Sequence, residues 1–528
     1  MLQILFKSST KHLWLLSSIS GVLVFLSFET FNLPLLAFVF PAIFNWLAFQ
    51  RQSLKSNFVL GFLTSLVIML GGFYWVTYVI HEFGNVPWSF ALLIFSAFAG
   101  FGALNFPIFF CLAAYLNNKL KHSTTSNLFW SFWFTLFLPA LFATAEYFFP
   151  KIFPWYLGHC LYRWTYVTQI VEVTGSLFLS FAIYSFGGAV GLFLIPPIKL
   201  TRKPWEALVI PIAVWSVAFC FSYFRINHPP PKGKTLRVAI IQANIGSLDK
   251  LNSENGVQGL VDQVIQKYTQ LTETALKSRP DLVVWPETAM PFSIGSTPER
   301  DRFLSDKLIQ WKTPLITGGY GRSQRNYFKD FNGAFLLSPA SQGGTIQTQI
   351  YMKNILLAFG EYFPFGEYFP ILYKYFPQVA DFERGEEQKP VILPDGTSLG
   401  VTICYEAIVP SFFRKTAAHP ILGVVNLTND SWFGPTSEPH LHGSLSIFRS
   451  LETKLPLIRA TNTGLSFSVD SLGNRSPTTS VYSSEILNTE VTLPAEPPST
   501  FYLKYGDWFV ILLILIQLSF GFYIVLKP

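Results

Sequence analysis

The chain has 528 residues, of which 50% are hydrophobic and only 13% are charged, against about 25% charged residues in an average soluble protein. This composition argues against a purely soluble protein and favours a membrane protein long enough for two domains. The net charge of +7 does not indicate nucleic acid as a partner, because the basic residues lie in short loops between apolar runs and form no single basic stripe.

Apolar runs recur along the first 223 residues and once more near the end of the chain. They lie near 12–29, 32–50, 57–80, 88–115, 127–149, 167–197, 205–223 and 507–526. A helical span needs about 20 apolar residues to cross roughly 30 Å of hydrocarbon. The pattern therefore predicts a polytopic α-helical membrane domain with about eight spans.

Basic residues are distributed unevenly between the two sides of this arrangement. One side holds Lys7, Lys11, Arg51, Lys55, Lys119, Lys121, Lys199, Arg202, Lys203 and Lys527. The opposite short loops hold Lys151 and Arg163. Because basic loops stay in the cytoplasm, we expect both termini to be cytoplasmic and the segment 224–506 to lie outside the cytoplasmic membrane.

The polar segment forms the second of three predicted parts, which are a transmembrane domain at 1–223, an external domain at 224–506 and a last span at 507–528. Proline-rich sequence marks its borders at 229–231 and 494–498, where a helix cannot continue. Strand-like segments at 236–245, 281–285, 314–320, 332–337, 398–404 and 422–427 are interspersed with helix-like segments at 257–276, 297–311 and 441–454. Such alternation predicts a layered α/β domain.

Three reactive side chains of the external domain lie where strand-like runs end. Glu287 follows Val284-Trp285-Pro286, Lys353 follows Tyr351-Met352, and Cys404 follows Thr402-Ile403. Active residues of α/β folds gather at the carboxyl ends of strands. We therefore expect a carboxylate, an ammonium group and a thiol to lie together.

Each of these groups suits one task in acyl transfer. A thiol is only a few per cent ionised at neutral pH, so Cys404 needs a base such as Glu287 or a lowered pKa to act as a nucleophile. A helix predicted to start within 407–417 would favour the thiolate through its N-terminal amides. Lys353 would face the negative charge of a tetrahedral intermediate, where loss of one donor costs about 3–4 kcal/mol.

The cysteines do not indicate metal or disulfide chemistry. Cys111, Cys160, Cys220 and Cys404 include no CxxC pair and no matching histidine spacing. We expect no metal ion and no cofactor. His440 and His442 suggest a Cys–His pair, but the Glu and Lys segments already supply the base and the oxyanion partner, so both histidines are expected to be structural.

The three segments, in this order, resemble the nitrilase superfamily across the external domain. The resemblance implies a four-layer αββα sandwich with Glu287 as general base, Lys353 as oxyanion stabiliser and Cys404 as nucleophile.

Spans, an external nitrilase-like domain and one last span together resemble the apolipoprotein N-acyltransferases. The segments FGEYFP at 359–364, NDSWFG at 429–434 and FPWYLG at 153–158 match motifs of that family. The resemblance implies that Cys404 takes a fatty acyl chain from a membrane phospholipid as a thioester. The acceptor would be the N-terminal α-amine of diacylglyceryl-cysteine on apolipoproteins, at the periplasmic face of the bacterial cytoplasmic (inner) membrane.

Further residues receive supporting roles from the same resemblance. Glu361, Tyr405 and Glu406 are expected to support the base and the nucleophile. Trp432 and Phe433 are expected near the acyl chain, while Trp155 belongs either to an interfacial aromatic belt or to a substrate contact. One departure is that the tryptophan usual in the family after Asn244-Ile245 is absent from 246–251.

Two other functions fit parts of the sequence. A membrane-tethered nitrilase-type amidohydrolase would use the same triad and release its product to water, although one anchor would suffice for it. A transporter with an appended binding domain would need ionisable residues or broken helices within its spans, and the spans contain few charges. The membrane half therefore favours a lipid-handling transferase.

Overall fold

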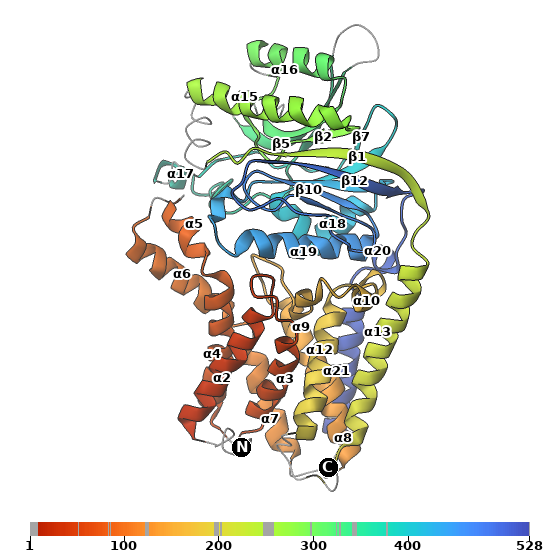
Figure 1. Ribbon diagram of the computed structural model, residues 1–528. Helices are drawn as coiled ribbons and strands as arrows, with labels where there is room; N and C mark the ends of the chain where they lie inside the picture. The colour runs from red at the N-terminus through yellow and green to blue at the C-terminus, as the bar shows by residue number, and fades with distance from the viewer. Residues whose placement is uncertain are drawn as a thin grey trace. The chain divides into compact units, whose positions relative to one another are not determined.

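A computed structural model of the chain describes residues 9–50, 52–82, 84, 86–121, 126–194, 200, 203–246, 258–295, 298–323, 325–326, 329–339, 346–375 and 379–526. The chain forms two compact units (Figure 1). Unit 1 comprises Met1–His81, Val86–His228 and Lys504–Pro528, and unit 2 comprises Glu82–Asn85 and Pro229–Leu503. The division after His228 coincides with the start of the prolines at 229–231.

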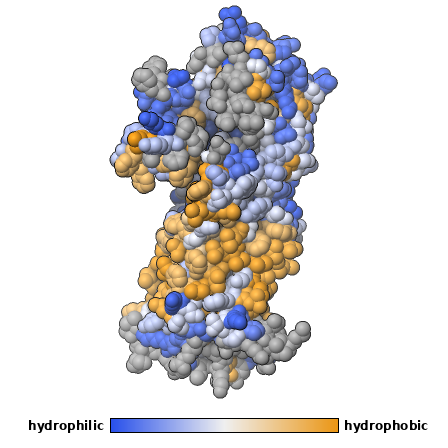
Figure 2. Space-filling model, turned by 90° about the vertical axis from the view of Figure 1, so that its left-hand side faces the viewer, coloured by the Kyte–Doolittle hydropathy of each residue, from blue (hydrophilic) through white to orange (hydrophobic). Residues whose placement is uncertain are grey.

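Unit 1 is helical. Its main helices are α2 (Thr10–Leu26), α3 (Leu36–Leu47), α4 (Leu54–Phe73), α5 (Val76–Glu82), α6 (Trp88–Gly102), α7 (Pro107–Leu120), α8 (Asn127–Phe132), α9 (Leu138–Phe148), α12 (Leu177–Leu194), α13 (Val209–Asn227) and α21 (Trp508–Leu526). A π-helical turn, Trp133–Phe137, joins α8 to α9. Figure 2 shows hydrophobic side chains covering most of the face of unit 1 in view.

Five segments among the described residues are long and apolar enough to cross a membrane. They are Leu54–Phe73, Trp88–Leu120, Asn127–Phe148, Leu177–Leu194 and Trp205–Asn227. Thr10–Leu26, Leu36–Leu47 and Trp508–Ile524 are shorter apolar helices. The 12 residues of α3 span only about 18 Å at 1.5 Å per residue. Apolar helices are thus present at all eight predicted positions, and five of them are long enough to cross a membrane. That all eight cross it stays a prediction.

The predicted span at 167–197 begins later than expected. Only α12, from Leu177, is a long helix there, and it is preceded by the short turns η2 (Leu157–Leu161), α10 (Thr165–Thr168) and α11 (Val171–Thr174). Gly175, with φ of 75°, ends this stretch, because a left-handed residue cannot continue a right-handed helix. Buried Glu146 accepts hydrogen bonds from Leu157 N at 3.1 Å and Tyr184 OH at 2.7 Å, and so fixes these turns to α9 and α12.

Unit 2 contains two mixed sheets. The first sheet has the order β12 (Glu485–Pro494), β1 (Lys232–Gln242), β2 (Leu282–Val284), β4 (Leu315–Arg322), β5 (Asp330–Pro339) and β6 (Ile346–Met352), with β3 (Met290–Ser293) paired to β4. The second sheet has the order β11 (Phe467–Val469), β10 (Leu457–Thr461), β9 (Gly423–Thr428), β8 (Ser398–Ile403) and β7 (Val391–Ile392). Within them, β1, β2 and β4 run parallel, as do β8, β9 and β10.

Side chains alternate along the strands of the first sheet and fill two cores. On β1, Val238 and Ile240 pack with residues of the second sheet, whereas Ala239 and Ile241 pack against the helices α15 (Gln258–Ala275) and α16 (Pro298–Trp311). This period of two is that of a strand buried on both faces. Each face of the first sheet therefore has its own apolar core.

Helices cover the outer faces of both sheets. In unit 2, α15 and α16 lie over the first sheet, and α18 (Pro410–Ala417) and α19 (Glu438–Thr453) lie over the second (Figure 1). The expected four-layer αββα sandwich is confirmed.

Candidate active site

The three reactive residues of the sequence prediction follow three different strands. Glu287 lies three residues after β2, while Lys353 directly follows β6 and Cys404 directly follows β8. Two of these strands belong to the first sheet and the third to the second sheet. The site is therefore assembled from both sheets of unit 2.

Lys353 lies between two carboxylates at the centre of the site. Its Nζ is 2.9 Å from Oε1 of Glu287 and 2.8 Å from Oε2 of Glu361. Burial opposes its charged form, but the negative charges of Glu287 and Glu361 outweigh burial and raise the pKa of Lys353 well above its usual value. The ammonium group is therefore held charged, as oxyanion stabilisation requires.

Asn332 completes the arrangement, and the sequence analysis did not find it. From β5, its Nδ2 donates to Oε1 of Glu287 at 2.8 Å and to Oε1 of Glu361 at 2.7 Å. The backbone N–H of Asn429 donates to the other oxygen of Glu287 at 3.0 Å. One feature of the sequence could have indicated Asn332, namely a single amide among apolar neighbours in a predicted strand. A polar group buried in this way must find hydrogen-bond partners.

Cys404 is the first residue of the 3₁₀ turn η5 (Cys404–Ile408) and has φ of 52°. This left-handed conformation is uncommon for a residue with a side chain and persists only when its surroundings enforce it. The side chain is 7% exposed. Burial and the charge of Glu287 raise the pKa of Cys404 well above its usual value, although Lys353 acts in the opposite direction.

The helix expected to start within 407–417 is present as α18 (Pro410–Ala417), but it does not lower the pKa of Cys404 overall, because burial and the charge of Glu287 raise that pKa. Residues 404–408 form a 3₁₀ turn, and α18 begins only at Pro410, so no N-terminal turn of an α-helix starts at the thiol. The raised pKa of Cys404 means that its resting form is the neutral thiol. Such a thiol needs a base, and Glu287 is the carboxylate whose charge acts on it most strongly.

Glu406 connects the two strand ends that hold Lys353 and Cys404. One oxygen accepts hydrogen bonds from the backbone N–H groups of Asn354 at 2.5 Å and Ile355 at 2.9 Å, just after Lys353. The other accepts from Ile403 N at 2.8 Å and from Tyr351 OH at 2.7 Å. Burial raises the pKa of Glu406 to about 7 against these donors. Glu406 therefore supports Lys353 and Cys404 through hydrogen bonds to the backbone beside them.

The other predicted residues lie in different places. Tyr405 packs against the core between the sheets, and burial raises its pKa to about 12. Trp432 and Phe433 lie in the turn η6 (Asp430–Phe433), where Phe433 is buried. Trp155 belongs to unit 1, where it is buried with Lys151 Nζ 4.8 Å from its ring centroid, so it is not an exposed belt residue.

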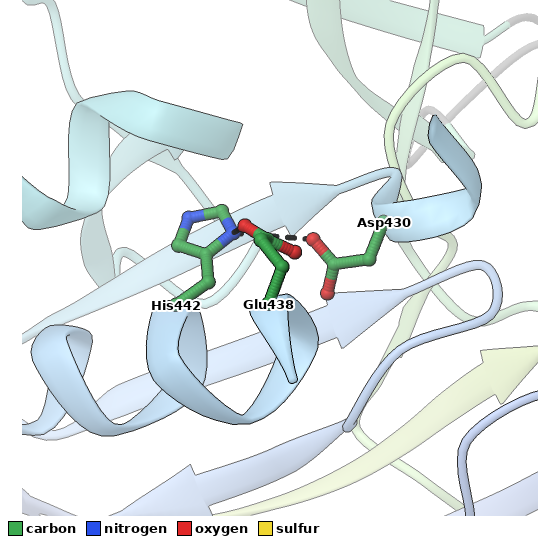
Figure 3. A group of neighbouring side chains, drawn as sticks. All are labelled: Asp430, Glu438 and His442. Carbon is green, nitrogen blue, oxygen red and sulfur yellow. Dashed lines mark hydrogen bonds and ion pairs between the residues drawn. The ribbon is translucent and has the colours of Figure 1, made fainter. Parts of the chain in front are cut away.

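A second buried cluster contains Asp430, Glu438 and His442, whose possible ligand atoms lie within 4.8 Å of one another (Figure 3). Such donors can hold a divalent cation. Here the guanidinium of Arg459 already lies 3.0 Å from Asp430, and a metal ion would face that positive charge. The cluster therefore suits shared protons better than a metal ion.

The fold and the site define the class of the protein. Residues 229–503 form an αββα domain of the nitrilase type that brings a cysteine, a lysine and two glutamates together, and residues 237–495 match the family model for carbon-nitrogen hydrolases. Residues 20–189 match a second family model, that of the apolipoprotein N-acyltransferase N-terminal domain.

Relatives of known name cover nearly the whole chain. The apolipoprotein N-acyltransferase of Bdellovibrio bacteriovorus is 31% identical over 94% of this chain and 91% of its own length. That of Geobacter metallireducens is 31% identical over 94% and 92%, and that of Vibrio vulnificus is 26% identical over 92% of each chain. The chain belongs to the apolipoprotein N-acyltransferase family.

Proposed function

We propose that this chain transfers a fatty acyl group from a membrane phospholipid, through a thioester on Cys404, to the N-terminal α-amine of diacylglyceryl-cysteine on apolipoproteins. The observation that carries the proposal is a buried cysteine, Cys404, whose site also holds a lysine ammonium within 2.9 Å of two carboxylates. The same chain carries a unit of membrane-type helices. The family name supplies the apolipoprotein acceptor, and a membrane phospholipid is the acyl donor that a unit of apolar helices would reach.

In the first half-reaction Glu287 acts first as a base and then as an acid, while Lys353 stabilises the oxyanion. Glu287 removes the Cys404 thiol proton, and the sulfur attacks the carbonyl carbon of the phospholipid ester. Negative charge then develops on the carbonyl oxygen, where the Lys353 ammonium stabilises it. The ester C–O bond breaks, the lysophospholipid oxygen takes the proton from Glu287, and the acyl group remains on sulfur as a thioester.

The second half-reaction uses Glu287 and Lys353 in the same roles. The neutral α-amine attacks the thioester carbon, and Lys353 stabilises the second tetrahedral intermediate. Glu287 takes a proton from the attacking nitrogen and returns it to the leaving sulfur as the C–S bond breaks. The products are an amide on the lipoprotein and a free Cys404 thiol, so one base serves both steps.

An exposed apolar segment of unit 2 supports a lipid substrate. Between residues 359 and 375 six aromatic or aliphatic side chains are more than half exposed, namely Phe359, Phe365, Tyr368, Phe369, Ile371 and Tyr375. The segment follows Lys353 in the chain, and Phe359 is two residues from Glu361. Apolar side chains gathered on a surface mark an interaction site, and acyl chains match this one chemically.

The proposed location is the bacterial inner membrane, with both termini cytoplasmic and unit 2 periplasmic. Within unit 1, α2 begins and α21 ends at the same end (Figure 1), as this orientation requires. Five of the basic residues from which this orientation was predicted lie outside the described residues, namely Lys7, Arg51, Lys199, Arg202 and Lys527. Reporter fusions to each terminus test it, and a periplasmic signal from either would contradict it.

Mass spectrometry of the purified protein tests the chemistry. Wild-type protein incubated with phospholipid should gain one acyl group on Cys404, and Cys404→Ala should gain none. Cys220→Ala is the matched control, because Cys220 is exposed on α13 in unit 1, and it should acylate normally. A wild type without the adduct, or an adduct that persists in Cys404→Ala, would refute the mechanism.

Adding an acceptor separates the transferase from the amidohydrolase alternative. A synthetic diacylglyceryl-cysteine peptide should discharge the thioester and appear as an N-acylated product. Release of free fatty acid at an equal rate with and without the peptide would instead identify a hydrolase.

A further inference from the structure

Behind Cys404, buried side chains close a ring of hydrogen bonds on its carbonyl oxygen. His442 Nε2 and Asn426 Nδ2 each lie 3.4 Å from that oxygen. His442 Nδ1 is 3.1 Å from Oδ1 of Asp430, whose Oδ2 accepts from Arg459 at 3.0 Å. Arg459 in turn donates to Oδ1 of Asn426 at 2.8 Å. We call Cys404, His442, Asp430, Arg459 and Asn426 the carbonyl ring.

The carbonyl ring is sealed from water and closely packed. His442, Asp430, Arg459 and Asn426 are each at most 1% exposed. A methyl group on Gly464 would come within 2.1 Å of Oδ2 of Asp430, so that carboxylate has no free space beside it. Closely packed buried networks hold one geometry, and this one ends on the peptide group of the nucleophile.

The neighbours of His442 determine where its protons lie. Nε2 faces only the Cys404 carbonyl in the ring, and a carbonyl oxygen accepts but cannot donate, so this contact is a hydrogen bond only if Nε2 carries hydrogen. Nδ1 faces Asp430 and also Oε1 of Glu438 at 3.4 Å. Burial opposes ionisation of Asp430, but the charge of Arg459 and the hydrogen bond of His442 hold its pKa below the usual value, so the ring closes at Asp430 only if Nδ1 carries hydrogen as well. Burial and the charge of Arg459 lower the pKa of His442, whereas Asp430 and the Cys404 carbonyl act in the opposite direction. Burial and the charge of Asp430 raise the pKa of Glu438 well above its usual value, so Glu438 keeps its own proton.

A fixed carbonyl matters because Cys404 has an unusual backbone. Its φ of 52° is uncommon for a residue with a side chain, and such strain persists only where neighbours over-determine it. The direction of the Cys404 side chain depends on this φ. A relaxed peptide would turn the sulfur away from the substrate carbonyl, and a misplacement of about 1 Å can slow a reaction by about 100-fold.

We propose that His442 is a positioning residue, whose Nε2–H donates to the Cys404 carbonyl and, through the carbonyl ring, keeps the nucleophile aligned for acyl transfer. The inference rests on the proposed function and adds a residue that touches neither substrate nor thiol. Asp430 and Glu438 set the imidazole protonation and orientation, and Arg459 fixes Asp430.

Two substitutions of His442 separate its two nitrogens. The amide nitrogen of glutamine reaches the place of Nε2, so His442→Gln keeps a donor to the Cys404 carbonyl. The amide nitrogen of asparagine reaches only the place of Nδ1, so His442→Asn keeps the Asp430 contact and loses the carbonyl contact. His440→Gln, on the same helix, is the matched control.

The measurement is the rate of Cys404 acylation as a function of phospholipid concentration. We expect His442→Asn to slow the maximal rate about 10- to 100-fold with little change in half-saturation, whereas His442→Gln and His440→Gln stay within about threefold of wild type. Equal rates for the Asn and Gln variants, or a change in half-saturation alone, would overturn the proposal. A wild type that forms no acyl-enzyme would instead refute the proposed function itself.

A measurement on the wild-type protein avoids any question of variant folding. With ¹⁵N-labelled histidine, solid-state NMR reports whether each ring nitrogen carries hydrogen. The signal of His442 is assigned by its loss in His442→Gln or, should that variant not fold, by its contact with ¹³C-labelled carbonyl carbon of cysteine. A protonated Nε2 supports the proposal, and an unprotonated Nε2 overturns it.

Discussion

Replacing Lys353 by methionine should damage stability and catalysis through different groups. The substitution leaves buried Glu287 and partly buried Glu361 without the ammonium group, although the amide of Asn332 still donates to Oε1 of each. Removing one partner of a buried ion pair costs about 3–5 kcal/mol, which for a domain of this size corresponds to a fall in Tm of roughly 6–10 °C. Loss of the oxyanion partner should also slow acylation about 10²–10³-fold.

A second substitution distinguishes the two effects. Adding Glu361→Gln to Lys353→Met removes one uncompensated charge. The double variant should therefore recover at least half of the fall in Tm, while its acylation stays slow. The pKa of Lys353 is raised in the folded state, so its stabilising contribution is complete below its usual pKa of 10.5 and is lost only at higher pH.

Thermal unfolding of the full chain in detergent and the rate of acyl-enzyme formation measure these effects, with Lys389→Met, an exposed lysine of unit 2, as the control. A Lys353→Met protein as stable as wild type would contradict the reasoning. So would a double variant no more stable than the single variant, because the destabilisation would then not come from the two carboxylates.

Three further substitutions have defined outcomes. Glu287→Gln should lower the pKa of Cys404, because the charge of Glu287 raises it. Alkylation of Cys404 should therefore occur at lower pH than in wild type, and acyl transfer should be lost. An unchanged pH profile of alkylation would contradict this. Glu406→Gln leaves two hydrogen-bond donors facing the side-chain N–H₂ group of glutamine. Because an unsatisfied buried polar group costs about 1–3 kcal/mol, we expect a lower Tm and slower acylation. Tyr405→Phe is the control and should stay near wild type in both. Gly318→Ala places a methyl group 2.5 Å from the Cα of Glu287, so the rate of acylation should fall at least about 10-fold. Gly396→Ser, at an open turn position, is the control and should keep the wild-type rate of acylation even if its Tm falls.

The strand ends could be located from sequence because buried strands show a simple pattern. The runs before Glu287 and Cys404 are apolar and end at a polar residue, and both coincide with β2 and β8. The αββα class followed from the resemblance of the three segments. The structure brings Glu287, Lys353 and Cys404 together as expected, and their catalytic roles stay predictions.

The rest of the site depends on contacts between residues far apart in the chain. Asn332 reaches Glu287 across 45 positions, and His442 reaches Cys404 across 38. No local pattern distinguishes such residues from ordinary polar residues of a strand or a helix. The helix expected within 407–417 begins at Pro410, but no sequence pattern indicated the 3₁₀ turn Cys404–Ile408 that precedes it.

The order of the chain has a consequence for how unit 1 is assembled during synthesis. Its last helix, α21, packs against α9, where Gln517 Nε2 lies 3.1 Å from Thr144 Oγ1. At the start of α21 Trp508 Nε1 donates to Val173 O at 2.7 Å. All of unit 2 is translated before α21 exists, so the surface of α9 that α21 covers stays open until unit 2 has been synthesised. The membrane unit is thus completed last, after the domain it anchors has left the ribosome.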